Sequence, residues 1–408
     1  MELQSDVIIT GGGLNGPALG LALAQAGLTV TVIDAQPARA RAEANFDGRA
    51  YALAIASQRL LAATGVWERI AADAQPMLEI KTSDGRAGEG PSPFRLHFEA
   101  AEIEEGPMGF MVEDRHLYAG FLDAMAAEAN LTHLPGATVV AQEAGSAGMT
   151  LALADGRRIC GRMLAGCDGR ASGTAARAGI GRTGWGYGQT ALVCAVAHER
   201  PHRGIAHQFF MPSGPLAILP LTGNRSSIVW SETEATAKAI AALSDDDFLD
   251  VLRPRFGDFL GRIELAGGRF TYPLTLTLAN SYVAPRLALV GDAAHGVHPI
   301  AGQGLNLGFR DVGALAEVLV DAARRGEDIG AGDVLDRYQS WRRFDSTALA
   351  LGMDSVNRLF SNDNPLLRGA RNLGMGVVGR LPGLRRGFIR QAAGLSGTAP
   401  RLLRGHAL

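Results

Sequence analysis

The first 34 residues alternate between short apolar runs that predict strands and a longer Ala/Leu-rich run that predicts a helix. Residues 6–10 and 29–33 are apolar and β-branched, as in buried strands. Between them lie a glycine-rich turn at 11–16 and a helix-forming run at 17–26, which Gly27 ends. The pattern predicts a strand–turn–helix–strand unit at the start of an α/β domain.

Farther along, the pattern predicts two kinds of sheet. Strand-like segments broken by Gly and Pro occupy 76–110, and residues 188–231 alternate as in an antiparallel sheet of a second domain. The other predicted elements are helices at 57–64, 114–129 and 304–324, a hairpin at 150–159 with its turn at Asp155-Gly156, buried strands at 163–167 and 287–290, and a helix N-terminus at 244–247.

Composition narrows the class of protein. A chain of 408 residues is longer than one compact core usually accommodates, which favours two domains and an appendage. A formal net charge of -2 argues against a nucleic-acid partner. We expect a cytoplasmic protein, because no signal-like or membrane-spanning apolar run is evident. The cysteines Cys160, Cys167 and Cys194 lack metal-binding spacing, so we expect free thiols and no metal site.

The glycine-rich turn carries the first candidate chemistry. Gly11, Gly13 and Gly16 fit the G-x-G-x-x-G pattern, with Asn15 inside it. The first glycine permits the tight turn, the second lets a pyrophosphate approach the backbone, and the third allows close helix–strand packing. Asp34 follows the second strand, where a carboxylate can hold a ribose hydroxyl. We therefore predict dinucleotide binding rather than a ligand-free turn; the motif does not distinguish FAD from NAD.

A second candidate segment lies almost the whole chain away. Gly291 and Asp292 follow a predicted strand, and the carboxylate could accept from a ligand hydroxyl. A Gly-rich turn then opens the helix predicted at 304–324; its candidate ligand-contacting residues are Pro299, Gly302, Gln303, Gly304, Leu305 and Asn306. His295 and His298 superficially resemble a metal cluster, but the Gly/Pro loop and the absence of a nearby cysteine argue against one.

Together these motifs resemble the FAD-dependent aromatic-ring monooxygenases, the para-hydroxybenzoate hydroxylase-like superfamily. The run from His298 to Gly308 most resembles the ubiquinone-biosynthesis hydroxylases among them. The resemblance extends over most of the chain, including the Asp-Gly segment 166–172 and the tail segment 359–365. Two small departures are Asp34, where Glu is commoner, and Thr10, where some relatives have glycine.

The resemblance implies an α/β fold. It has a three-layer, Rossmann-like FAD-binding domain, a β-sheet substrate domain and a C-terminal helical region. The implied division is discontinuous: residues 1–75, 101–180 and 272–350 form the FAD domain, 76–100 and 181–271 the substrate domain, and 351–408 the helical region. It also implies cofactor contacts for Arg49, Arg115 and Asp168. In isolation, each of these would be read as a surface arginine or an ordinary turn.

The implied reaction is hydroxylation of the phenolic ring of a polyprenylated ubiquinone precursor. NAD(P)H, docking transiently, would reduce FAD, and O2 would then form a C4a-hydroperoxyflavin. No protein base is assigned. The alternatives are an FAD hydroxylase of another aromatic compound and a catalytically silent FAD-binding subunit of a biosynthetic complex. A plain NAD dehydrogenase ranks third.

Two regions have open interpretations. Phe210, Leu219 and Pro220 are core strand positions by default, although the resemblance places the equivalent sheet against the substrate. From Arg358 to the end the chain has nine arginines and one aspartate, interspersed with apolar residues. This tail is either a solvated helical surface or a basic amphipathic element that contacts the inner membrane peripherally.

Overall fold

The computed structural model describes residues 2–38, 45–103, 105–298, 302–361, 374 and 381–408. Its first sheet is mainly parallel and has the order β18-β19-β11-β1-β2-β8. The strands are β18 (Val283–Ala284), β19 (Leu287–Leu289), β11 (Arg158–Gly166), β1 (Glu2–Thr10), β2 (Val30–Asp34) and β8 (Leu131–Pro135), with β9 (Val139–Ala144) and β10 (Met149–Leu153) as an antiparallel extension.

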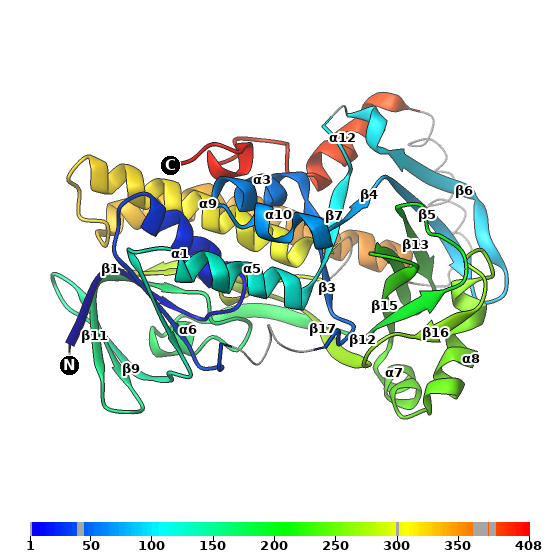
Figure 1. Cartoon of the computed structure of the whole chain (residues 1–408), viewed down its shortest axis with the longest axis horizontal. Coiled ribbons are helices and arrows are strands. Elements are labelled where there is room, and N and C mark those ends of the chain that lie inside the picture. Colours follow the sequence, from blue (N-terminus) through cyan, green and yellow to red (C-terminus); the bar gives the residue numbers. More distant parts are fainter. Residues whose placement is uncertain (1, 39–44, 104, 299–301, 362–373, 375–380) are drawn as a thin grey trace.

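Helices cover this first sheet and share its apolar core (Figure 1). They are α1 (Asn15–Gln25), α5 (Asp114–Ala126), α9 (Gln303–Arg324) and the first half of α10 (Gly332–Phe360). Helix α1 is buried along most of its length between the sheet and α9, which explains its small and apolar composition. The predicted first unit, the hairpin at 150–159 and the helix at 304–324 are all confirmed.

The second sheet is mostly antiparallel, with the order β20-β17-β12-β15-β14-β13-β5-β6. The strands are β20 (His295–Gly296), β17 (Phe270–Ala279), β12 (Arg182–His198), β15 (Arg225–Thr233), β14 (Gly214–Leu221), β13 (Ile205–Met211), β5 (Glu79–Arg86) and β6 (Gly90–Glu99), and β16 (Ile263–Leu265) pairs with β12. Helices α7 (Glu234–Ala241) and α8 (Asp245–Phe256) pack on its outward face. The predicted helix N-terminus is confirmed, since Ser244 caps α8.

A small third sheet lies between the two large ones. It consists of β3 (Ala50–Ala54), β7 (Gly109–Glu113) and β4 (Gln75–Met77). Its Met77 and Met111 pack against the inward face of the second sheet at Ala206 and Leu221. In the described part of the chain, the other α-helices are α3 (Ile55–Ala63), α4 (Trp67–Ile70), α6 (Gly173–Arg177) and α12 (Pro382–Ala392).

The structure bears on two of the predicted domain boundaries. Residue 272 lies inside β17, which pairs with β12 and β20 in the second sheet. Residue 350 lies inside the continuous helix α10. We therefore propose that these boundaries lie nearer Ala279 and Phe360. The second half of α10 reaches the second sheet, where Asn357 donates to Gln189 and Trp185 donates to Asp354.

Candidate functional site

The glycines of the first turn have different surroundings. Gly11 has φ +101°, and a side chain there would overlap the Cys167 carbonyl; a side chain at Gly16 would overlap the Gly11 carbonyl oxygen. A Cβ on Gly13, however, would have no atom within 4 Å. Gly11 and Gly16 are therefore required by the packing of the turn itself, whereas Gly13 borders open space at the start of α1.

Helices α1 and α9 begin with backbone N–H groups available to a ligand. Among the described residues, neither helix has a side-chain hydrogen bond at its N-cap or an acidic residue in its first turn. Helix α8 differs, because Ser244 accepts from the Asp247 N–H and three aspartates occupy its first turn. The first N–H groups of a helix need acceptors and form its positive dipole end. The two uncapped ends therefore suit an anionic or electron-rich ligand.

Asp34 lies at the end of β2, directly against the glycine-rich turn. A side chain at Gly12 would overlap its carboxylate, so Gly12 is required for this approach. One carboxylate oxygen accepts from the Gln36 N–H at 3.0 Å, and the Tyr118 hydroxyl lies 3.4 Å from the other. Neither Gly12 nor Tyr118 was predicted from the sequence as a site residue. The carboxylate is thus held beside the turn, where it could accept from a ribose hydroxyl.

Asn15 joins segments that are far apart in the sequence. A Cβ at Gly308 would come within 2.6 Å of the Asn15 amide, and one at Gly291 would overlap it. The Asn15 Oδ1 atom is buried and has no hydrogen-bond partner among the described residues. Two glycines therefore let the first turn dock against the Gly291 loop and α9, which brings the two halves of the predicted site together.

Asp292 follows β19 as the partly exposed residue of a short turn whose other residues, Gly291 and Ala293, are buried. Its carboxylate is 37% exposed and pairs with Arg170 at 3.2 Å, while Arg182 donates to the backbone carbonyls of Asp292 and Ala293 at 2.6 and 2.7 Å. The backbone of the turn is thus fixed independently of the carboxylate, which is accessible to a ligand hydroxyl.

We expect Asp292→Ala to lower FAD occupancy at least several-fold with little loss of stability, because it removes an acceptor and one exposed ion pair. The measurement is the ratio of flavin absorbance to protein after purification. Arg170→Ala is the matched control, since it breaks the same ion pair and keeps the carboxylate. Equal losses of FAD in the two variants would show that the ion pair, and not the carboxylate alone, is responsible.

A buried charged cluster supports the Gly291 turn from behind. Asp311 on α9 is fully buried; it accepts from the Gly291 N–H at 3.0 Å, contacts His295 at 2.5 Å and accepts from Arg342 at 2.8 Å. Burial alone would raise the pKa of Asp311, but the neighbouring His295 and Arg342 outweigh it and lower the pKa below its ordinary value. Asp311 and Arg342 were not predicted from the sequence; the available signal was a charged residue on the apolar face of a long helix.

Asn306 fixes α9 against the third sheet. Its Oδ1 accepts from the Ala54 N–H at 2.8 Å and the Ser57 hydroxyl at 2.7 Å, and its Nδ2 donates to the carbonyls of Ala52 and Gly302 at 2.8 and 2.9 Å. These four bonds use the full capacity of an amide side chain. The side chain therefore positions α9 against the third sheet, and contact of Asn306 with the cofactor stays a prediction.

The other predicted contact residues lie at the N-terminus of α9. Gly302 has φ +61°, and a Cβ there would lie 2.8 Å from Ala52. A Cβ at Gly304 would meet nothing within 4 Å, as at Gly13. Gln303 is buried and Leu305 is half-buried against the core. Pro299 lies outside the described residues.

His298 is buried without a polar partner. Neither ring nitrogen has a hydrogen-bond partner among the described residues, and the ring packs edge-on against Tyr187 with centroids 5.1 Å apart. Burial lowers the pKa of His298 to about 4, so the imidazole is neutral at physiological pH. Within the described part of the chain, no group of three His, Cys, Asp or Glu residues is arranged to hold a metal ion.

Arg49 and Arg115 lie near one another at the edge of the third sheet. Arg49 pairs with Asp47 at 2.7 Å and with Asp114 at 3.6 Å, and Arg115 pairs with Glu113 at 2.8 Å. Both guanidinium groups are about one-third exposed. They are held by carboxylates from their own neighbourhood, and contact with a cofactor remains a prediction for both.

Asp168 has a clear local role. Its carboxylate accepts from the Ser172 hydroxyl at 2.5 Å and from the Thr174 N–H at 2.9 Å, which stabilises the turn into α6. A Cβ at Gly11 would come within 2.8 Å of the Asp168 backbone nitrogen, so this turn packs against the first glycine-rich turn. The structure places Asp168 beside the site, with its carboxylate engaged locally.

The predicted substrate residues divide between two faces of the second sheet. Leu219 packs on the inward face, against the apolar cluster that contains Met77, Met111 and Leu221. Phe210 stacks on Phe360 of α10 with ring centroids 4.1 Å apart. Leu216 and Ile218 point outward, so Pro220, at the next even position of β14, shares their face. Contact of Pro220 with the substrate therefore stays a prediction that its outward face does not favour. Trp230 is also outward-facing core.

The assembled groups fit a long dinucleotide. Carboxylates at Asp34 and Asp292 can accept from sugar-like hydroxyls. Two uncapped helix ends offer N–H donors, and Gly13 and Gly304 leave space beside them. Cofactor contact by each named residue is a proposal based on this donor set.

Comparisons with known proteins agree with this fit. The family described as FAD binding domain matches residues 4–350. Ubiquinone hydroxylase UbiL of Rhodospirillum rubrum is 46% identical over 404 residues, covering 98% of this chain and 93% of the relative. The 3-demethoxyubiquinol 3-hydroxylase of Escherichia coli is 37% identical over 395 residues, covering 96% and 99%.

Among solved structures, p-nitrophenol 4-monooxygenase PnpA from Pseudomonas putida superposes with a TM-score of 0.80 at 19% identity, covering 97% of this chain and 99% of that one. This likeness supports the fold alone, and it confirms the predicted fold class. The matched family and the two relatives show the family and the cofactor: the chain belongs to the FAD-dependent hydroxylases of ubiquinone biosynthesis, and FAD is its cofactor.

Proposed function

We propose that this chain hydroxylates the phenolic ring of a polyprenylated ubiquinone precursor. One atom of O2 enters the ring, and the other leaves as water with two electrons from NAD(P)H. The observation that carries the proposal is the near-full-length identity of 46% to a ubiquinone hydroxylase, together with the paired segments at Gly13 and Asp292.

The protein groups have binding and positioning roles in this proposal. FAD, when bound, supplies electron transfer and oxygen activation. The N–H groups at the start of α1 hold its phosphates, and those of α9 favour negative charge on the ring system. Asp311 and Asn306 position these two segments, while the apolar inward cluster around Met77, Met111 and Leu221 favours exclusion of water and an apolar substrate.

The decisive experiment is mass spectrometry of quinone intermediates in cells that lack this chain. We expect ubiquinone to be lost and a polyprenyl phenol lacking one oxygen to accumulate, which also identifies the ring position. Re-expression of the intact chain should restore the profile. A normal quinone profile, with no redundant enzyme present, would contradict the proposal.

The two alternatives give different results with purified holoenzyme. A hydroxylase of another aromatic compound would oxidise NADH or NADPH faster with that compound than with a ubiquinone precursor. A silent FAD-binding subunit would bind FAD but show no stimulation by any phenol. Comparing NADH with NADPH in the same assay also identifies the preferred co-substrate. Membership of a biosynthetic complex is a further prediction, tested by co-purification.

We also propose that α12 contacts an anionic membrane surface. Leu381, Leu384 and Phe388 are exposed at helical spacing along one side, while Ile389 is buried against the FAD domain. Arg386 is exposed on the same helix, two positions from both Leu384 and Phe388, and its positive charge can attract anionic lipid. No helix in the described residues is long and apolar enough to cross a bilayer.

We expect Leu384→Gln combined with Phe388→Gln to reduce co-sedimentation with phosphatidylglycerol-containing liposomes several-fold, because these side chains are 52% and 57% exposed and form the apolar stripe. The control is Phe344→Gln, which removes an 82% exposed phenylalanine from α10. Equal liposome binding by the double variant and the unmodified protein would count against a membrane role for α12.

A further inference from the structure

A cavity of about 900 Å³ lies on the outward face of the second sheet. Ile205, His207 and Phe209 of β13 line it, whereas the intervening Ala206 packs on the inward face against the third sheet. Side chains of a strand alternate between faces, so the sheet separates this cavity from the proposed FAD and substrate region. Its volume is within the range of small-molecule sites.

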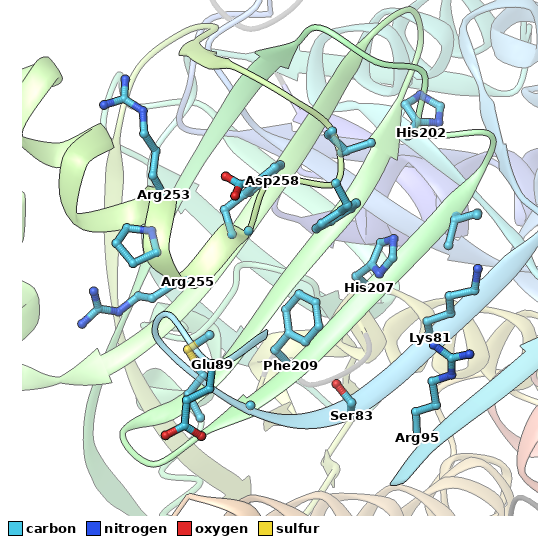
Figure 2. Close-up of a pocket in the computed structure, with 18 of the residues that line it drawn as sticks. Lys81, Ser83, Glu89, Arg95, His202, His207, Phe209, Arg253, Arg255 and Asp258 are labelled. Carbon is cyan, nitrogen blue, oxygen red and sulfur yellow. The ribbon is translucent and has the colours of Figure 1, made fainter. Parts of the chain in front are cut away.

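The charge of this cavity is strongly positive. Seven lysine or arginine side chains line it, and among the described lining residues only Glu89 and Asp258 carry negative charge. Lys81 of β5 and Arg95 of β6 lie close together at one rim (Figure 2). Lys81 has one carboxylate partner, Glu79 at 3.0 Å. Within the described part of the chain, Arg95 has no acidic partner within 4.0 Å, so this rim can accommodate a further negative charge.

The interior combines apolar surface with a polar group that lacks a partner. Phe209 and Phe259 line the cavity on either side of the His207 ring. Ser83 is 3% exposed, and its hydroxyl has no hydrogen-bond partner among the described residues. In the sheet register Ser83 lies opposite Phe209 and Arg95, and Figure 2 shows it between them. A buried hydroxyl without a partner is unfavourable, and a ligand that bonds to it would remove this cost.

The His207 ring favours an uncharged contact. Burial, with a further contribution from the positive charge of Lys81, lowers the pKa of His207 to about 4. At neutral pH it is therefore an uncharged ring between two phenylalanines, and it adds to the apolar interior rather than to the basic rim.

We propose that this cavity binds a single-chain anionic amphiphile. Its phosphate or carboxylate group lies between Lys81 and Arg95 and within reach of the Ser83 hydroxyl, and its hydrocarbon chain lies over Phe209 and Phe259. A small inorganic anion would leave the apolar surface exposed, and a neutral lipid would leave the basic rim unpaired. The proposal does not depend on the reaction assigned above.

The test uses the FAD-loaded protein carrying the Leu384→Gln and Phe388→Gln changes, which removes the apolar stripe of α12 as a competing site. Calorimetric titration compares dodecyl phosphate, below its micelle concentration, with inorganic phosphate and with dodecyl maltoside. We expect dodecyl phosphate to bind at one site at least tenfold more tightly than either comparator. Equal affinity for inorganic phosphate, or for the neutral detergent, would overturn the proposal.

Two sets of variants locate the site. We expect Lys81→Ala with Arg95→Ala to weaken dodecyl phosphate binding at least tenfold, and Ser83→Ala about threefold. Lys238→Ala, on the exposed side of α7, should have no effect. Unchanged affinity in the Lys81 and Arg95 double variant would overturn the assignment.

Chemical labelling gives an independent check on the unmodified chain, so the result does not depend on a variant that folds. The chain has two lysines, Lys81 and Lys238. Dodecyl phosphate should slow acetylation of Lys81 several-fold, measured by mass spectrometry, and leave Lys238 unchanged. Equal acetylation of Lys81 with and without the ligand would contradict the proposed site.

Discussion

Gly13→Ala is expected to weaken FAD binding at least tenfold while the apoprotein unfolds at an unchanged temperature. The new Cβ meets no protein atom within 4 Å, so the folded chain accommodates it. It enters the space beside the α1 N-terminus that we assign to the pyrophosphate, where a methyl group prevents close approach of the backbone. Reconstitution of apoprotein with FAD, followed by flavin fluorescence, measures the dissociation constant.

Two further glycine variants separate cofactor loss from folding loss. Gly16→Ala should lower both FAD binding and apoprotein stability, because its Cβ overlaps the Gly11 carbonyl oxygen. Gly332→Ala should change FAD binding little; it also places a methyl group in open space at a helix N-terminus, but on α10. If Gly13→Ala binds FAD as tightly as Gly332→Ala does, the pyrophosphate does not lie against Gly13.

Arg342→Met is expected to destabilise the protein by about 3–5 kcal/mol, because it leaves the buried Asp311 carboxylate without its guanidinium partner. FAD occupancy should fall as well, since the same carboxylate holds the Gly291 N–H. Chemical unfolding of the apoprotein measures the first effect and flavin content measures the second. The control is Arg337→Met on the same helix, whose ion pair with Glu327 is 41% exposed on the arginine side and should be worth less than about 1 kcal/mol.

The Arg342→Met variant should be more sensitive to acid than the unmodified protein. The folded-state pKa of Asp311 is lowered, so its ionised form stabilises the fold above its ordinary pKa of 3.8, and this stability is lost as the pH falls through the folded value. Without Arg342 the folded pKa rises, and acid unfolding should begin at a higher pH than in the unmodified protein. An unchanged acid midpoint would show that the cluster does not hold Asp311 ionised.

Local patterns predicted much of the fold and part of the site. The turn at Gly11–Gly16 and the helix from Gln303 were predictable, because glycine spacing and helical periodicity are local signals. The ion pair of Asp311 and Arg342 was not predictable. The two residues are 31 positions apart, and in the sequence each is one charged residue in an amphipathic helix, with nothing to show that the two meet. The face that Pro220 takes was not predictable either, because in an unbroken apolar run only the strand pairing shows how the side chains alternate.

The hydrogen bonds of the Asn306 side chain also could not be predicted from the sequence. Its four protein partners come from α9, β3 and α3, and only the packed structure shows that they saturate the amide. Residues in a recognisable binding motif therefore divide into those that border open space, such as Gly13, where we propose that the ligand lies, and those that hold the surrounding segments in place, such as Asn306.

Helix α10 restricts how the molecule can open. Its 29 residues form a rod of about 43 Å. Near one end Tyr338 donates to the Leu289 carbonyl under the first sheet, and near the other Asn357 donates to Gln189 in the second sheet. A wide hinge motion between the two sheets would bend this rod or break contacts at one end. Admission of a bulky isoprenoid and departure of the hydroxylated product are therefore expected to depend on local loop displacements, with the two halves moving as one body.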